Sequence, residues 1–249
     1  MFLESNYSIT RLFLDKTVTI IVREEEKAPI SWKFNLILKP IKEMFLNDQW
    51  NISYHLLTNS DYKNMMLLKK DVNISSFEAI KLLLCDLGKY DKFRLMADAL
   101  IQSLGEIIPN LEIDFQNREL KIDNHIITEE IWEYVLYLLK LSYGEKVTPP
   151  LTFDSEEARK FYLAQKAAEE RIKKIKGAKA GDIDSLSKMM LSITYAFPSF
   201  SFEYLWDQTL AQILWLQKYA AGAMSYEVNA QAFAAGNVKK GKKLDFFIK

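Results

Sequence analysis

A long apolar segment in the last quarter of the chain limits the possible fold more than any other feature. Residues 199–222 are predicted to form one helix that contains Trp206 and Trp215. Apolar side chains point almost all round this helix, because only a few polar residues such as Asp207 and Gln212 interrupt it. A helix that is apolar on every side must be covered by its own protein or by another one. The question of function is therefore largely a question of what covers this helix.

The composition is that of a folded chain with no net charge. The 249 residues include 33 basic and 33 acidic ones, so the overall field does not predict binding to nucleic acid. Cys85 is the single cysteine, which excludes an intramolecular disulfide and favours a reducing compartment. Residues 1–14 lack the pattern of a signal peptide, and no run reaches the ~18–20 apolar residues of a membrane span. We expect a cytoplasmic protein without a membrane partner.

The first half of the chain mixes strand and helix patterns. Alternation predicts a strand or short hairpin within 12–23, and a helical period predicts a helix over 31–45 that Pro40 kinks or splits. Ser75 or Ser76 is expected to cap a helix that ends at Gly88, and a further helix is expected over 89–104.

The clearest local motif is a hairpin followed by a helix. Residues 111–115 and 119–122 alternate on either side of a Gln116–Asn117 turn, which predicts two paired strands. Thr128 is then expected to cap an apolar helix that runs to Gly144, with Glu129 and Glu130 near its positive end.

Thr148–Pro149–Pro150 divides the chain, because neither proline can continue a helix. The predicted fold is α+β and mainly helical: an N-terminal domain with a few antiparallel strands plus helices, and an all-helical C-terminal region. The expected parts are an N-terminal domain (1–148), a Pro-rich hinge (149–154), a helical region (155–236) and a basic-aromatic tail (237–249).

The predicted helical region begins with a charged helix over 155–176. Phe161 and Ile172 belong to an apolar seam with steps of three and four, which is typical either of a coiled-coil-like contact or of a surface helix packed on its own domain. A flexible linker is expected over 177–181. The next helix carries Leu186, Met189, Met190 and Ile193 on its apolar face.

Few residues suggest catalysis or a cofactor. His55 and His125 are far apart in the sequence and have no partner at metal-ligand spacing, while Cys85 falls on the apolar side of its helix. We expect no catalytic, cofactor-binding or metal-binding residues. One remote alternative is a metal-dependent nuclease with Asp114, Glu119 and Lys121 on neighbouring strands. A hairpin with a charged outer face explains the same residues.

The tail offers two interpretations. Four lysines within 239–243 could contact phosphates, or they could belong, together with Phe246 and Phe247, to an arm that docks on a protein. We favour the protein contact, since the whole chain is neutral.

Two stretches resemble a known family. The first is the hairpin at 113–122 with Ile126–Ile127–Thr128–Glu129–Glu130 and the helix from Ile131. The second is the helix at Trp206–Asp207–Gln208–Thr209 with Ala232–Phe233–Ala234–Ala235–Gly236 and the lysines of 239–243. This order resembles tail assembly chaperones of tailed phages and prophages of Gram-positive bacteria. The resemblance implies a non-enzymatic protein of the host cytoplasm that keeps the helical tape-measure protein soluble and helps recruit tail-tube subunits.

Large apolar side chains are the expected contacts with such partners, because aromatic anchors dominate interface energies. The predicted partner-binding residues are Trp206, Leu210, Ile213, Trp215, Phe161 and Ile172. The alternative function is a permanent virion component of the neck, connector or baseplate. The sequence leaves open whether the Trp206/Trp215 helix is core or interface.

Overall fold

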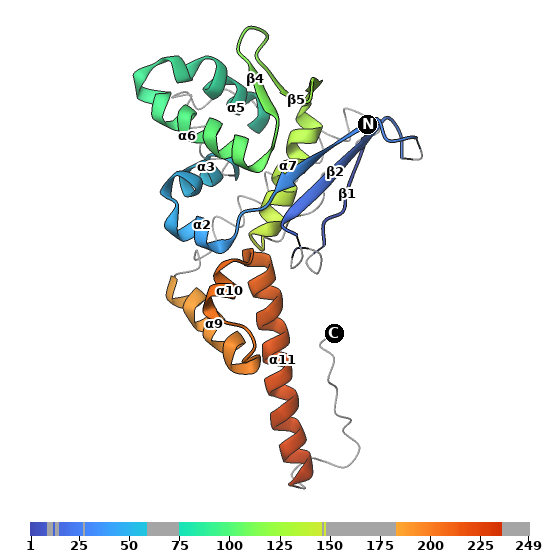
Figure 1. The fold of residues 1–249 in the computed structure, drawn as a ribbon, viewed down its shortest axis with the longest axis vertical. Coiled ribbons are helices and arrows are strands. Elements are labelled where there is room, and N and C mark those ends of the chain that lie inside the picture. Colours follow the sequence, from blue (N-terminus) through green and yellow to red (C-terminus); the bar gives the residue numbers. More distant parts are fainter. Residues whose placement is uncertain are drawn as a thin grey trace.

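The computed structural model describes residues 1–8, 12, 15–26, 28–58, 75–145, 147 and 183–235. Helices dominate these residues, and two small antiparallel sheets complete them, which confirms the predicted mainly helical α+β class. Figure 1 shows two parts: a body that contains both sheets, and a group of C-terminal helices packed against one end of it. We refer to these parts as the body and the helix group.

The first sheet comprises β1 (Phe2–Ser5), β2 (Thr17–Arg23) and β3 (Trp32–Ile37), paired antiparallel in that order. The strand predicted within 12–23 is confirmed over β2. Its alternating side chains Val18, Ile20 and Val22 are buried.

The helix predicted from Ser31 is wrong over β3. Phe34 and Leu36 are buried while Lys33 and Asn35 are exposed, which is the two-residue period of a strand. Pairing of β3 with β2 stabilises this strand. In the sequence alone, a short apolar run does not distinguish a strand from a helix. A helix, α2 (Ile41–Leu46), begins only after Pro40, which occupies its N-cap position.

The second sheet confirms the predicted hairpin. Strands β4 (Leu111–Asp114) and β5 (Glu119–Ile122) pair antiparallel, and β6 (His125–Ile126) pairs with β5. The tight turn between β5 and β6 places Asp123 and Asn124 at φ of 48° and 68°. Two successive left-handed residues are what a two-residue hairpin turn requires.

In the described part of the body, the remaining helical elements are α3 (Asp48–Thr58), α5 (Ser76–Cys85), η1 (Leu87–Lys89), α6 (Asp91–Ile107) and α7 (Glu129–Ser142). Two predicted caps are confirmed, because the Ser75 and Thr128 hydroxyls accept hydrogen bonds from the backbone N–H groups of Glu78 and Ile131. The helix α5 ends before the expected Gly88, whereas α6 begins after Lys89 and continues past the expected end at Leu104. Trp50 and Trp132 are the largest fully buried side chains of the core that these elements enclose.

The helix group comprises α9 (Ile183–Ala196), α10 (Phe202–Trp206) and α11 (Leu210–Ala234). The single helix predicted over 199–222 is therefore wrong: it breaks at Asp207–Thr209 and resumes for longer than expected. Thr209 and Gln212 explain the new start, since the Gln212 side chain accepts from the Thr209 N–H at 2.7 Å and the Thr209 hydroxyl accepts from the Gln212 N–H at 3.4 Å. This reciprocal capping box begins a helix at Leu210.

The helix group is attached to the body through α2. Ile41 is fully buried, and it packs in the core of the helix group rather than in that of the body. Its N–H donates to the Gln208 carbonyl at 2.8 Å, and the Lys42 ammonium lies 2.7 Å from the Asp207 carboxylate. At the end of α7, Gly144 has a φ of +70°, and any Cβ there would collide with Leu214 of α11.

Several sequence predictions fall outside the described residues. These are the hinge at 149–154, the heptad-like helix at 155–176 with Phe161 and Ile172, the linker at 177–181 and the tail at 237–249. In the portion of the chain that the structure covers, no helix has the length and apolar character needed to cross a membrane.

Candidate partner-binding surface

The helix group has its own small core. The predicted apolar face of α9 is confirmed: Leu186, Met190 and Ile193 are buried, and Met189 packs against them. On α11, Ile213, Leu216 and Ala220 are buried in the same cluster. Helices α9 and α11 therefore pack along their lengths as far as Ala220.

The predicted partner-binding residues on α10 and α11 lie mainly on the inner side of this group. Ile213 is 0% exposed, so in this structure it lies in the core of the helix group, which is the core alternative that the sequence left open for this residue. Trp206, Leu210 and Trp215 are partly buried and pack against the same cluster. Trp215 also contacts Tyr219, with ring centroids 4.3 Å apart. Phe161 and Ile172 lie outside the described residues.

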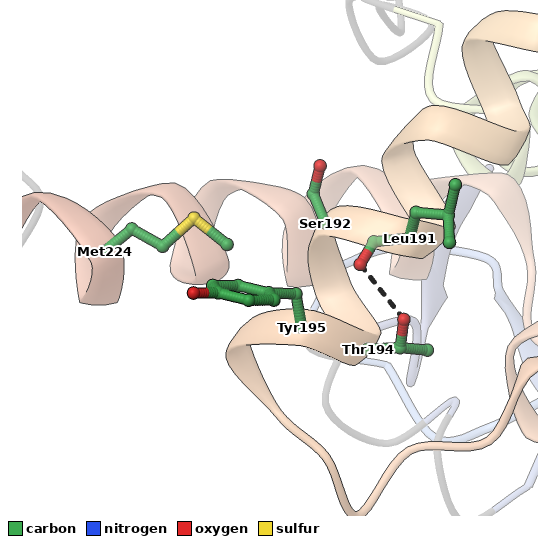
Figure 2. Close-up of a pocket in the computed structure, with 5 residues that line it drawn as sticks. All are labelled: Leu191, Ser192, Thr194, Tyr195 and Met224. Atoms are coloured by element: carbon green, nitrogen blue, oxygen red, sulfur yellow. Dashed lines mark hydrogen bonds between the residues drawn. The ribbon is translucent and has the colours of Figure 1, made fainter.

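The outer side of the helix group carries the more accessible apolar side chains. Leu191 and Tyr195 of α9 are 55% and 79% exposed, and Val228 of α11 is 65% exposed. Leu191, Ser192, Thr194, Tyr195 and Met224 line an open groove of about 570 Å³. Figure 2 shows Tyr195 and Met224 extending toward each other from the two helices. We call this feature the α9/α11 groove.

Two hydroxyl groups of the α9/α11 groove are hydrogen-bonded to their own helix. The Thr194 hydroxyl donates to the Leu191 carbonyl at 3.0 Å, and the Ser192 hydroxyl donates to the Lys188 carbonyl at 2.9 Å. No charged side chain is among the five that line the groove. The surface offered to a ligand is therefore apolar and uncharged.

Beyond Ala220, α11 leaves the core. It continues to Ala234, and Figure 1 shows this half projecting away from the body. None of the side chains described between Ala221 and Ala235 is buried, and Glu227 is the only charged residue in that range. At 1.5 Å per residue, this half is about 22 Å long. Its exposed surface is poorly charged for a helix in water.

The hairpin residues considered for a nuclease do come together. The Lys121 ammonium lies 2.8 Å from the Asp114 carboxylate and 3.1 Å from the Glu119 carboxylate. The hydrogen bond from Lys121, followed by that from the Asn117 N–H, holds the pKa of Asp114 well below its usual value. Both carboxylates are thus paired with the same lysine, and the three side chains form the charged hairpin face expected as the alternative. Among the described residues, no group of three or more His, Cys, Asp or Glu side chains is arranged to hold a metal ion.

The histidines and the cysteine also have structural surroundings. His125 is exposed and stacks on Trp32 with ring centroids 4.6 Å apart, which joins β6 to β3. Exposed His55 meets the edge of Tyr54. Cys85 is fully buried, as predicted, and this burial raises the pKa of its thiol.

Sequence reasoning missed the residues of the α9/α11 groove. The signal was present in α9: once Leu186, Met190 and Ile193 occupy the inner face, Leu191 and Tyr195 remain as an apolar pair four residues apart on the other face. Met224 lies opposite that pair in the structure, but in the sequence it follows the small residues Ala221–Gly222–Ala223, which give no signal of an apolar surface.

Comparisons of the chain with protein-family models, with curated proteins and with solved structures found no match. A ligand for the α9/α11 groove is therefore inferred from the chemistry of the groove itself.

Proposed function

We propose that this protein is a non-enzymatic assembly factor that binds a helical protein partner, in the manner of a phage tail assembly chaperone. The observation that supports this proposal is the apolar, uncharged α9/α11 groove together with the projecting half of α11. Contiguous apolar surface of this kind is typical of sites that bind proteins. The partner that the sequence resemblance implies is a tape-measure protein, with tail-tube subunits recruited around it in the host cytoplasm.

The spacing of the exposed side chains suits a helix as ligand. Leu191 and Tyr195 are four residues apart on α9, and Met224 and Val228 are four residues apart on α11. Each pair thus forms one ridge along its helix. A partner helix lying between two such ridges would insert apolar side chains at steps of three and four. Met224 is well suited to such a contact because its unbranched side chain adapts to different neighbours.

The partner-binding residues predicted on α10 and α11 have a structural role in this proposal. Because Trp206, Leu210 and Trp215 pack against the core of the helix group, their main contribution is to hold α10 and α11 in place. A direct contact between their remaining exposed surface and a partner stays a prediction.

The test is co-expression with a tape-measure protein, the class of helical partner that the sequence resemblance implies. Val228→Asp places a carboxylate on the exposed ridge, whereas Asn229→Asp places one on the neighbouring exposed residue, which faces another direction. We expect Val228→Asp to weaken co-purification about tenfold or more, because binding would bury the charge against apolar groups. Asn229→Asp should have little effect. Equal binding by wild type and both variants would contradict the proposal.

A second measurement distinguishes a chaperone from a virion component. Mass spectrometry of purified phage particles should not detect a chaperone, which leaves the assembled tail. A fixed copy number of this chain per particle would instead support the neck, connector or baseplate alternative.

A further inference from the structure

We infer that two copies of this chain form a dimer in which the projecting halves of α11 pack against each other in opposite directions. The contact surface is a row of residues along α11 that we call the seam: Tyr219, Gly222, Tyr226 and Asn229. The argument depends on the spacing of the seam, on its uncharged flanks and on the position of the body.

The seam follows the period with which helices pack along each other. Its members are separated by three, four and three residues, which is the spacing of one contact face in a coiled coil. Tyr219 is 50% exposed, and Asn229 is exposed as well. Trp215 lies four residues before Tyr219, and the two ring centroids are 4.3 Å apart, so residues at this spacing do share one side of α11.

The seam and the α9/α11 groove lie on different sides of α11. Met224 of the groove and Tyr226 of the seam are two residues apart, which places them about 200° apart around the helix. A second copy on the seam therefore leaves the groove open to a helical partner. The dimer does not rest on the proposed function.

The flanks of the seam suit an identical helix. In the projecting half these positions are small and uncharged: Ala223, Ser225, Ala230 and Ala232. Coiled coils commonly select a partner through charges at these positions. Here a charged partner would find no opposite charge, whereas two identical helices meet without repulsion and can approach closely. Glu227, the single charged residue of this half, lies outside both the seam and its flanks.

The direction of pairing follows from the position of the body. Figure 1 shows the body at the beginning of α11, with the projecting half leading away from it. Antiparallel pairing therefore keeps the two bodies at opposite ends, whereas parallel pairing would bring both to the same end. A contact only about 22 Å long is small for a protein interface, so we expect a reversible dimer with a dissociation constant in the micromolar range.

In the antiparallel register that meshes the two seams, polar residues meet polar residues. Tyr226 comes level with Asn229 of the second copy, and twofold symmetry repeats this pair. Asn229 donates one N–H to the Ser225 hydroxyl of its own helix at 3.4 Å. Its amide oxygen and its other N–H can then bond to the Tyr226 hydroxyl across the contact, so that neither group is buried alone. Gly222 comes level with position 233 and leaves room there.

Sedimentation equilibrium of the full-length chain tests the dimer, at concentrations from about 1 to 200 μM. Asn229→Asp adds a carboxylate to the seam, whereas Gln231→Glu adds one to the groove side of α11, and both residues are exposed. We expect the wild type to pass from monomer to dimer. Asn229→Asp should weaken dimerisation about tenfold, because the contact would bury its charge, and Gln231→Glu should dimerise like the wild type.

Disulfide formation between two variants tests the direction and the register. Chains with Tyr226→Cys are mixed with chains with Asn229→Cys, while native Cys85 stays buried. Antiparallel pairing brings these two positions to the same level, so the mixed disulfide should form about fivefold faster than either disulfide between identical variants. This experiment also decides the case in which Asn229→Asp loses its helical circular dichroism.

A monomer at every concentration would overturn the inference, and so would a dimer that Asn229→Asp and Gln231→Glu affect equally. Faster disulfide formation between identical variants would overturn the antiparallel register. Asn229→Asp also separates this inference from the proposed function, because it should weaken dimerisation without weakening co-purification of a helical partner. Each can therefore fail while the other stands.

Discussion

The body and the helix group bury their apolar residues to different extents. In the body, α7 buries side chains along its whole length, and Trp132 is 0% exposed. In the helix group, α11 buries its last side chain at Ala220 but continues to Ala234. The body also exposes single apolar side chains, such as Leu46 and Leu95 on different helices, which is normal for soluble proteins. In the helix group, by contrast, exposed Leu191 and Tyr195 line the α9/α11 groove.

This difference follows from how much surface is available to cover each helix. The body surrounds α7 with two sheets and several helices, so its apolar face finds partners on every side. The small helix group supplies α11 mainly with α9, which lies beside its first half (Figure 1). Apolar sequence that would be core in the body therefore becomes surface in the helix group. That surplus supports the proposed binding role.

The largest expected effect compares a tryptophan from each part. Trp132→Ala should lower the free energy of unfolding by about 3–5 kcal/mol, because it removes a fully buried indole and leaves a cavity. Trp215→Ala should lower it by about 2 kcal/mol, since its side chain is only partly buried. Urea unfolding followed by far-ultraviolet circular dichroism measures both changes.

Trp132→Phe is the control for the larger effect. The Trp132 indole N–H has no hydrogen-bond acceptor among the described residues, so a phenyl ring should restore much of the lost stability. If Trp215→Ala proved as damaging as Trp132→Ala, the helix group would be as fully packed as the body and the comparison would fail.

A smaller effect should show how the two parts are joined. In the sequence, Ile41 lies between β3 and α3 of the body, but its side chain packs in the core of the helix group. Ile41→Ala should reduce stability by about 2–4 kcal/mol. Hydrogen exchange should show the loss of protection mainly in α9 and α11, while β4, β5 and α7 stay protected. Loss of protection concentrated in the body would mean that Ile41 supports α2 and not the helix group.

Local signals in the sequence predicted much of the body. The Ser75 and Thr128 caps, the hairpin at Leu111–Ile122 and the burial of Cys85 depend on neighbouring residues or on periodicity, and the structure confirms them. The strand β3 was missed because its alternation is stabilised by pairing with β2, a contact between distant residues. The local sequence pattern carries no information about that pairing.

The candidate site could be predicted only in part. The sequence correctly pointed to an over-apolar region, but the predicted helix breaks at Asp207–Thr209, and the expected anchor Ile213 is buried in the core of the helix group. The Thr209–Gln212 capping box was visible in the sequence and would have indicated this break. Pairing of Tyr195 with Met224 across two helices had no local signal.

The smallest expected effect is on the pH dependence of stability, and it compares the hairpin of the body with α11. Hydrogen bonds from Lys121 and from the Asn117 N–H lower the pKa of Asp114 below its ordinary 3.8. A carboxyl group whose pKa is lowered by folding stabilises the folded state fully above the ordinary pKa. This contribution is lost as the pH falls below 3.8 toward the lowered value. The projecting half of α11 carries one charged residue, Glu227, and no ion pair like that of the hairpin is described for it.

Asp114→Asn tests this contrast through hydrogen exchange at the amides of β4 and β5, with the α11 amides of the same sample as the reference. At about pH 5 the wild-type hairpin should be better protected than that of Asp114→Asn, because the wild type keeps its ion pair with Lys121. At about pH 2.5 the difference should narrow, because Asp114 of the opened hairpin, with its ordinary pKa of 3.8, then binds a proton and opening becomes easier. A difference of the same size at both pH values would show that the hairpin turn is held by the hydrogen bonds that Asp114 accepts from Asn117, and not by the charge of Asp114. The acid sensitivity of the body would then have to come from other carboxylates.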